Sequence, residues 1–354
     1  MKIDRIAFNE PTVVVLGAGA TRGASFVEKL PGALPPLDTD FFTQVQRLSS
    51  AKPRRLVTDL IQDTVRIFGR NFRLTMEGYL THIEYLQNVF EAYRLRGRPR
   101  GSLYPQMRTH FLQALAALLD ESIGREPICK YHSILVNNLT PSDTILSFNY
   151  DWLIDETLRS KASGKWNPRR GYGVTAYSQG PKGAGTKYWA STDWTTGKPS
   201  YPPSTITLLK LHGSMNWFPV AAEDEDPKIQ LRQRWWHQKG NLSFEIAPPE
   251  WNKPLRSGIY RRLWPKARAA LKDVRALVFI GYSLPAADLP AQALFMVDAP
   301  GQGTAPHLRL LVIVNPDAAA RARIRDTLRN RLNPNTRVLT FDTLAGFAKY
   351  LDAA

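Results

Sequence analysis

Four short apolar runs, rich in β-branched residues, constrain the fold of this chain more than any other feature. Each run leads into small or polar residues, and the four runs cover residues 13–16, 144–148, 276–280 and 308–314. Apolar runs of this length are typical of parallel strands that are buried on both faces. Such strands present functional groups at their carboxyl ends. A fifth run, residues 208–211, leads directly into His212.

Helical spacing is found between these runs. Apolar side chains recur every three or four residues at 42–48, 56–68, 77–93 and 104–122. Further elements are predicted at 128–138, 152–158 and 260–274 as helices and at 337–341 as a strand. Strands that alternate with helices predict an α/β fold with a Rossmann-like doubly wound parallel sheet. We expect residues 1–42 and 127–354 to form this domain and residues 43–126 to form a helical insertion.

Composition places the chain among ordinary globular proteins, with 354 residues of which 43% are hydrophobic and 22% charged. No apolar run approaches the roughly 18 residues that a membrane span requires. The first residues contain no apolar secretory segment, so we expect a cytoplasmic protein. The single cysteine, Cys129, excludes an internal disulfide and a Cys-x-x-Cys zinc ribbon. Its neighbours indicate a buried helical position.

The charge balance is strongly basic, with 47 Lys and Arg against 31 Asp and Glu, a net charge of +16. The excess gathers in three clusters, within residues 94–108, 159–187 and 256–275. A field of this sign attracts polyanions. Two interpretations stay open: a surface for nucleic acid or an acidic partner, and a solvated basic surface without a partner.

A glycine turn follows the first apolar run. Gly17, Ala18 and Gly19 are followed by Gly23, so the spacing is Gly-x-Gly-x-x-x-Gly. Glycines at such a turn permit close approach of the backbone to a pyrophosphate at the start of a helix. A purely structural turn uses the same residues. No acidic residue follows on a second strand about 20 residues later, which disfavours an ordinary nicotinamide-dependent dehydrogenase.

Polar side chains follow two other runs. Asn149 and Asp151 stand at alternate positions after one run, and His212 stands before Gly213 after another. Asn and Asp are also common in surface turns, and a lone His is often a core residue. Because the carboxyl ends of parallel strands meet at one edge of a sheet, these side chains are expected to share a site with the glycine turn.

In this order, the segments resemble the bacterial sirtuin-like branch of the sirtuin superfamily. The resemblance rests on Gly17-Ala18-Gly19, Asn149-Tyr150-Asp151, His212-Gly213-Ser214, Gly281-Tyr282-Ser283 and Val314-Asn315, with Asp40-Phe41 matching a further segment. It covers about residues 12 to 316. The chain departs from the classical deacetylases of the superfamily, because one cysteine cannot form their four-cysteine zinc module. About 60 residues also separate Asn149 from His212. Both departures are usual in the branch that hydrolyses NAD.

The resemblance implies an NAD glycohydrolase that converts NAD, its substrate, to nicotinamide and ADP-ribose without a metal. It implies that Asn149 positions a water or the ribose and that His212 is the general base. An imidazole suits proton transfer at neutral pH. It further implies a binding set in which Gly17, Ala18, Gly19 and Thr21 hold the pyrophosphate and Asp151 holds the carboxamide. The remaining contacts would be Asp40 and Phe41 over the nicotinamide ribose, Gly281 and Ser283 at a phosphate or ribose, and Asn315 at the adenosine ribose.

Two other functions remain open: an NAD-dependent protein deacylase or ADP-ribosyltransferase, and a non-catalytic nucleic-acid-binding module. Relatives in the NAD-hydrolysing branch act in anti-phage defence, which implies an effector that a partner or oligomerisation activates. We therefore expect a homo-oligomer, with a HerA-type ATPase as a possible partner and DNA contact through the basic clusters. The helical segment 42–122 carries an apolar stripe from Tyr79 to Phe90. The stripe can pack within the helical insertion or against a second subunit.

Overall fold

The computed structural model describes residues 10–49, 54–92, 103–124, 127–162, 164–177, 204–220, 228–231, 246–247, 258–286, 288–296 and 307–353. Its centre is a six-stranded parallel sheet with the order β4-β2-β1-β7-β8-β9. The strands are β1 (Thr12–Leu16), β2 (Thr144–Ser147), β4 (Thr207–Lys210), β7 (Ala276–Ile280), β8 (Leu310–Val314) and β9 (Arg337–Phe341). The chain starts in the middle of the sheet and winds outward in both directions. This confirms the predicted Rossmann-like doubly wound fold.

The two central strands explain the apolar runs of the sequence. Every residue of β1 and β7 is buried, because each strand has a neighbour on both sides and helices on both faces. The register pairs Leu16 with Ser147 of β2 and with Ile280 of β7. The strands therefore end level with one another, and the loops that follow them emerge at one edge of the sheet.

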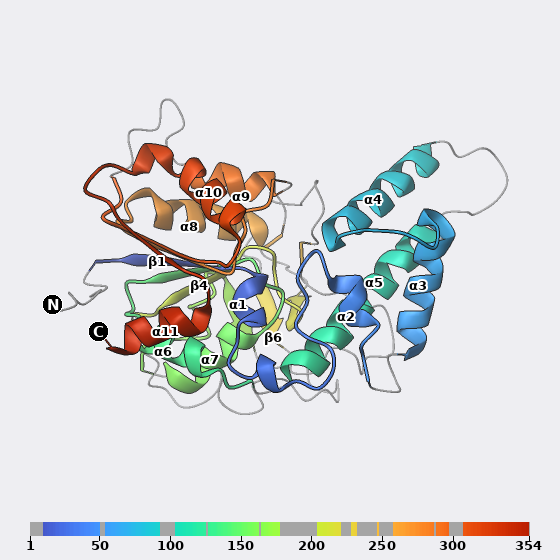
Figure 1. The fold of residues 1–354 in the computed structure, drawn as a ribbon, viewed down its shortest axis with the longest axis horizontal. Helices are drawn as coiled ribbons and strands as arrows, with labels where there is room; N and C mark the ends of the chain where they lie inside the picture. The colour runs from blue at the N-terminus through green and yellow to red at the C-terminus, as the bar shows by residue number, and fades with distance from the viewer. Residues whose placement is uncertain are drawn as a thin grey trace.

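Two layers of helices cover the sheet (Figure 1). One face carries α8 (Tyr260–Lys272), α9 (Leu289–Phe295) and α10 (Ala318–Thr327), and the short helix η2 (Arg329–Arg331) follows α10. The other face carries α1 (Ala18–Arg22), α6 (Lys130–Asn137), α7 (Leu153–Lys161) and α11 (Leu344–Ala353). The short helix η1 (Val27–Lys29) follows α1. The predicted helices at 128–138, 152–158 and 260–274 are thus confirmed, each with slightly different bounds.

The helices of the predicted insertion lie to one side of the sheet (Figure 1). They are α2 (Phe41–Val45), α3 (Arg54–Phe68), α4 (Met76–Ala92) and α5 (Leu103–Ile123). Helix α5 packs against α2, α3 and α4. One continuous cluster of buried apolar residues includes side chains from these helices and from the central strands. The insertion therefore shares its hydrophobic core with the sheet.

A second, smaller sheet was not predicted from the sequence. It has the order β3-β6-β5 and consists of β3 (Thr175–Tyr177), β6 (Lys228–Leu231) and β5 (Trp217–Val220). Each strand is only three or four residues long, too short for a reliable pattern of alternation. None of the described helices is long and apolar enough to span a membrane.

Candidate active site at the carboxyl edge of the sheet

Two loops press together where the strand order reverses, between β1 and β7. The amide of Gly17 donates to the carbonyl of Ile280 at 3.0 Å, and the amide of Gly19 donates to the carbonyl of Gly281 at 2.9 Å. A Cβ on Gly17 would lie 2.5 Å from the Cα of Tyr282. Gly281 has a φ of 61°, and a Cβ there would lie 2.1 Å from the amide nitrogen of Ala20. The contact between the loops therefore requires these glycines, whether or not a phosphate binds.

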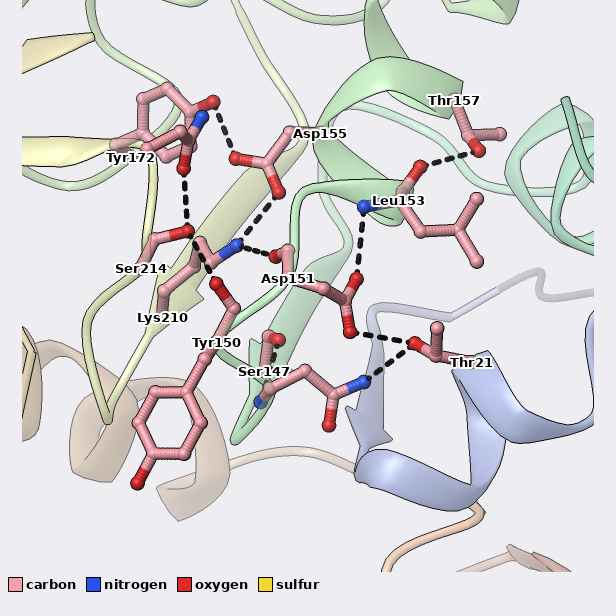
Figure 2. Close-up of polar contacts among 12 residues, drawn as sticks. Thr21, Ser147, Tyr150, Asp151, Leu153, Asp155, Thr157, Tyr172, Lys210 and Ser214 are labelled. Carbon is pink, nitrogen blue, oxygen red and sulfur yellow. Dashed lines mark hydrogen bonds and ion pairs between the residues drawn. The ribbon is translucent and has the colours of Figure 1, made fainter. Parts of the chain in front are cut away.

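Thr21 joins the two polar side chains that follow β2. Its hydroxyl donates to Asp151 Oδ2 at 2.8 Å (Figure 2). The same hydroxyl accepts from Asn149 Nδ2 at 3.2 Å. The other carboxylate oxygen of Asp151 accepts from the amide of Leu153 at 2.9 Å, at the start of α7. Thr21, Asn149 and Asp151 are all buried, so the structure brings these three predicted residues together.

Asn149 retains an acceptor that no described group uses. Its Oδ1 is buried, and no donor among the described residues lies within hydrogen-bonding geometry of it. Most buried polar atoms in proteins have a partner, and leaving one unsatisfied costs about 1–3 kcal/mol. The Nδ2 contact with Thr21 fixes the orientation of the amide. This oxygen therefore indicates a place where a bound molecule donates a hydrogen bond.

Asn149 and His212 follow the neighbouring strands β2 and β4 at equivalent positions. Ser147 of β2 pairs with Lys210 of β4, and each functional residue stands two positions further along its strand. Adjacent strands lie about 4.8 Å apart. Gly213, directly after His212, has a φ of 74°, which turns the chain away from the sheet edge.

A buried ion pair joins β4 to α7 at this edge of the sheet (Figure 2). Lys210 Nζ lies 2.9 Å from Asp155 Oδ2 and also donates to the carbonyl of Asp151. The hydroxyl of Tyr172 donates to Asp155 Oδ1 at 2.7 Å. Burial, and then the charge of Asp155, raises the pKa of Tyr172 well above its ordinary value, so this hydroxyl stays a donor. These residues were not predicted from the sequence, since a Lys inside an apolar strand carries no sign of its partner.

The imidazole of His212 lies among aromatic rings and beside a carboxylate. Its ring centroid lies 5.1 Å from that of Phe148, edge to face, and 6.1 Å from that of Tyr150, nearly parallel. Its Nε2 lies 3.3 Å from Asp288 Oδ2. Asp288 caps α9 and was not predicted as a site residue. The sequence Asp288-Leu289-Pro290 indicates a helix start, but its contact with a residue 76 positions earlier has no local signature.

Asp40 and Phe41 have contacts within the protein. Asp40 forms an ion pair with Arg22 of α1 at 2.5 Å and accepts from Gln44 at 3.0 Å. Phe41 is buried, and its ring lies 4.6 Å from that of Phe111 on α5. The structure places Phe41 in the apolar core and uses Asp40 to join α1 to α2.

The loops that follow β7 and β8 are bonded to each other. Asn315 Nδ2 donates to the carbonyl of Tyr282 at 3.3 Å, and its Oδ1 accepts from the amide of Asp317. The carbonyl of Ser283 accepts from Arg323 of α10. Leu284 is buried and has a φ of 46°, an uncommon conformation for a residue with a branched side chain. Strained residues of this kind concentrate at functional sites.

The basic clusters are only partly described. Arg94 to Arg100, Lys182, Lys187 and Arg256 lie outside the described residues. On α8, Arg261, Arg262 and Lys272 are exposed. Within the described ranges, no group of three or more His, Cys, Asp or Glu side chains is arranged to hold a metal ion.

The carboxyl edge of the sheet thus brings together the amide of Asn149 with its unused acceptor, the imidazole of His212 and the buried carboxylate of Asp288. These groups can orient a hydroxyl or a water and accept its proton. The chain matches no protein-family model, and a search of the curated proteins finds no match.

Proposed function

We propose that this protein hydrolyses the bond between nicotinamide and ribose in NAD. The observation that carries the proposal is the buried Oδ1 of Asn149, which has no donor among the described residues. A water or a ribose hydroxyl would supply that donor. The position supports a dinucleotide substrate, because doubly wound folds bind such ligands outside the carboxyl ends of the strands, where the strand order reverses.

The side chains suggest a division of roles. Cleavage of the bond passes through an oxocarbenium-like state, as in glycoside hydrolysis. Asn149 Oδ1 would hold the water for attack on C1′, and His212 would take the proton as the C1′–O bond forms. Nicotinamide leaves as a neutral molecule, so no acid is required to protonate it. Asp151 would accept the carboxamide N–H of the substrate, with its orientation held by Thr21 and Leu153.

The direct experiment is to incubate the purified protein with NAD and follow nicotinamide and ADP-ribose. His212→Ala is expected to release nicotinamide at least about 100-fold more slowly than the parent, the scale of a lost general base. His110→Ala is the matched control, because His110 also lies beside a carboxylate, 2.9 Å from Asp63, but on α5 within the helical insertion. Equal rates for the parent and His212→Ala would remove His212 from the mechanism.

A second arm separates hydrolysis from group transfer. The same assay with an acetylated peptide tests the deacylase alternative, and mass spectrometry of added protein tests ADP-ribosyl transfer. Hydrolysis predicts ADP-ribose as the product with and without the peptide. An absolute requirement for an acceptor would favour the alternatives.

Control of the activity is proposed to lie outside the site, as the resemblance to defence effectors suggests, with assembly or a HerA-type ATPase as the trigger. The apolar stripe on α4 offers less surface for assembly than its sequence suggests: Tyr79, Leu80 and Ile83 are buried, whereas Val89 is half exposed. Light scattering at micromolar concentration tests self-association, and a strict monomer would contradict it. An NAD-hydrolysis rate that partner, DNA and phage infection leave unchanged would contradict the regulated-effector proposal.

A further inference from the structure

Asp288 is a buried carboxylate that lies beside the imidazole of His212. Its Oδ2 lies 3.3 Å from His212 Nε2, and the two side chains are 3% and 8% exposed. They come from different parts of the fold: His212 follows the end of β4, and Asp288 is the residue that caps the start of α9. When His212 is protonated, an ion pair this well shielded from water is much stronger than one at the surface.

Two hydrogen-bond donors hold Asp288 in place. The hydroxyl of Tyr282 donates to Oδ2 at 2.8 Å, and the amide of Ala291 donates to Oδ1 at 3.4 Å. The ring of Tyr282 stacks on Phe148 with a centroid distance of 4.2 Å and an interplanar angle of 6°. Phe148 in turn contacts the His212 ring edge to face. The carboxylate, the imidazole and both rings therefore form one packed unit.

The hydrogen-bond donors to Asp288 favour its ionised form, against the burial and the charge of Glu77. Burial, followed by the charge of Asp288, raises the pKa of Tyr282 well above its ordinary value, and Glu77 of α4 and Tyr150 add to the effect. The Tyr282 hydroxyl therefore remains protonated and donates. Hydrogen bonds from the hydroxyl and a backbone amide favour the ionised form of a carboxyl group.

We propose that Asp288 is the positioning residue for His212. The carboxylate favours a proton on Nε2, which leaves Nδ1 as the nitrogen that accepts a proton. When the O–H bond of the attacking water breaks, the new N–H bond forms at Nδ1, and Asp288 stabilises the imidazolium without becoming protonated. The proton then passes to solvent. His212 Nε2 and Asp288 Oδ2 are 3.3 Å apart and outside hydrogen-bonding geometry, and contacts between a base and its orienting group often shorten and align when substrate binds.

The inference rests on the proposed function, and Asp288→Asn tests it. Asn keeps the shape of the side chain and an acceptor for Tyr282 but removes the charge. We expect kcat to fall at least about 100-fold, with KM changed less than about threefold, because the interaction acts on the proton transfer and not on substrate binding. The acidic limb of the pH profile of kcat/KM should move to lower pH, because the neutral amide of the variant no longer favours the imidazolium form of His212.

Two further variants separate positioning from general structural damage. Tyr282→Phe keeps the stacked ring and removes one donor to Asp288, so a smaller loss of about fivefold is expected. Asp63→Asn removes a carboxylate of α3 that lies beside His110. It should leave kcat and the acidic limb of the kcat/KM pH profile unchanged. An Asp288→Asn variant with the parental kcat and the parental pH profile would overturn the proposal.

A measurement without substrate separates this inference from the proposed function. Nuclear magnetic resonance of the His212 ring, assigned by comparison with His212→Ala, reports its protonation in the free protein. If the parent releases no nicotinamide, the proposed function fails. The pairing would still predict that the His212 signals titrate at lower pH in Asp288→Asn than in the parent. Identical titrations would overturn the pairing itself.

Discussion

The two ends of the central sheet bury polar side chains in opposite ways. At the amino end, Asp143 precedes β2 and is fully satisfied: its carboxylate accepts from the amide of Thr12 at 2.7 Å and from the amide and hydroxyl of Thr140 at 2.6 and 3.0 Å. Burial still raises the pKa of Asp143 above its ordinary value. At the carboxyl end, Asn149 keeps an acceptor without a donor among the described residues.

The two ends of the sheet therefore differ in how completely their buried polar groups are hydrogen-bonded. The amino end joins the starts of neighbouring strands through complete hydrogen bonding, whereas the carboxyl end combines an unused acceptor with the strained backbone of Leu284. A fold gains nothing in stability from either of these last features. We infer that substitutions at the amino end act on stability and that substitutions at the carboxyl end act on catalysis.

The largest effect is expected for Asn149→Ala. Nicotinamide release should fall at least about 100-fold, because the acceptor that orients the water is lost. Stability should fall by only about 1 kcal/mol, since the side chain has one hydrogen bond, to Thr21. Activity assays and thermal unfolding on the same preparation measure both quantities. Parental activity in this variant would contradict a catalytic role for the carboxyl end of the sheet.

The reverse pattern is expected for Asp143→Ala. Removing the carboxylate leaves the buried amide of Thr12 and the partly buried amide of Thr140 without their acceptor. The free energy of unfolding should fall by about 3 kcal/mol. The kcat of the folded fraction should stay within about twofold of the parent. Denaturant titration gives the stability, and a large loss of kcat in fully folded protein would contradict the division between the two ends.

A smaller effect is expected for Thr21→Val, which keeps the shape of the side chain and removes the hydroxyl between Asn149 and Asp151. Both side chains would lose their common partner. We expect kcat to fall about tenfold, because both groups remain but are less well oriented. Thr64→Val is the matched control, since the Thr64 hydroxyl is also buried but bonds the carbonyl of Leu60 within α3, in the helical insertion. Equal activities of the two variants would show that the Thr21 hydroxyl has no special role.

Cys129 offers a test through pH. Burial alone would raise the pKa of this thiol, but His132, whose Nδ1 lies 3.1 Å from Sγ, and the amide of Ser25 lower it to about 6. A thiol in an unfolded chain has a pKa of about 8.5. Because the folded value is the lower one, the thiolate stabilises the fold above about pH 8.5, and this contribution is lost as the pH falls through about 6.

The measurable consequence is a difference between the parent and Cys129→Ser. The stability advantage of the parent should shrink by about 3 kcal/mol between pH 8.5 and pH 5.5. Urea titrations at several pH values measure it. A difference that does not change with pH would mean that the thiol is not ionised in the folded protein.

The smallest expected effect is that of chelation. The proposed proton transfer uses only Asn149, His212 and Asp288, and none of its steps needs a metal ion. NAD hydrolysis should therefore survive exhaustive treatment with a chelator. A loss of activity that zinc or magnesium restores would place a metal in the mechanism.

The fold was largely predictable because its elements carry strong local patterns. The buried strands are apolar along their whole length, and α3 and α5 show helical spacing, so the predicted bounds agree with the structure within a few residues. The short strands β3, β5 and β6 and the helices α9, α10 and α11 were not predicted. Two of these elements are only four residues long, and β5 contains Pro219, which weakens a strand prediction.

The site was predictable only in part. Thr21, Asn149 and Asp151 do meet, because each follows the end of a parallel strand and such ends share one edge. Asp288, Lys210 and Asp155 could not be identified in advance, since each depends on a partner between 55 and 76 residues away.

The sequence alone determined which segments become strands and helices and which polar side chains stand at the strand ends, because hydrophobic pattern and turn residues act locally. Tertiary structure decided which strand ends become neighbours and which loops touch. It pressed Gly17 against Gly281 and placed Asp288 beside His212. The physical reason is that both contacts follow from the order and packing of the whole sheet, so no short segment contains the information that creates them.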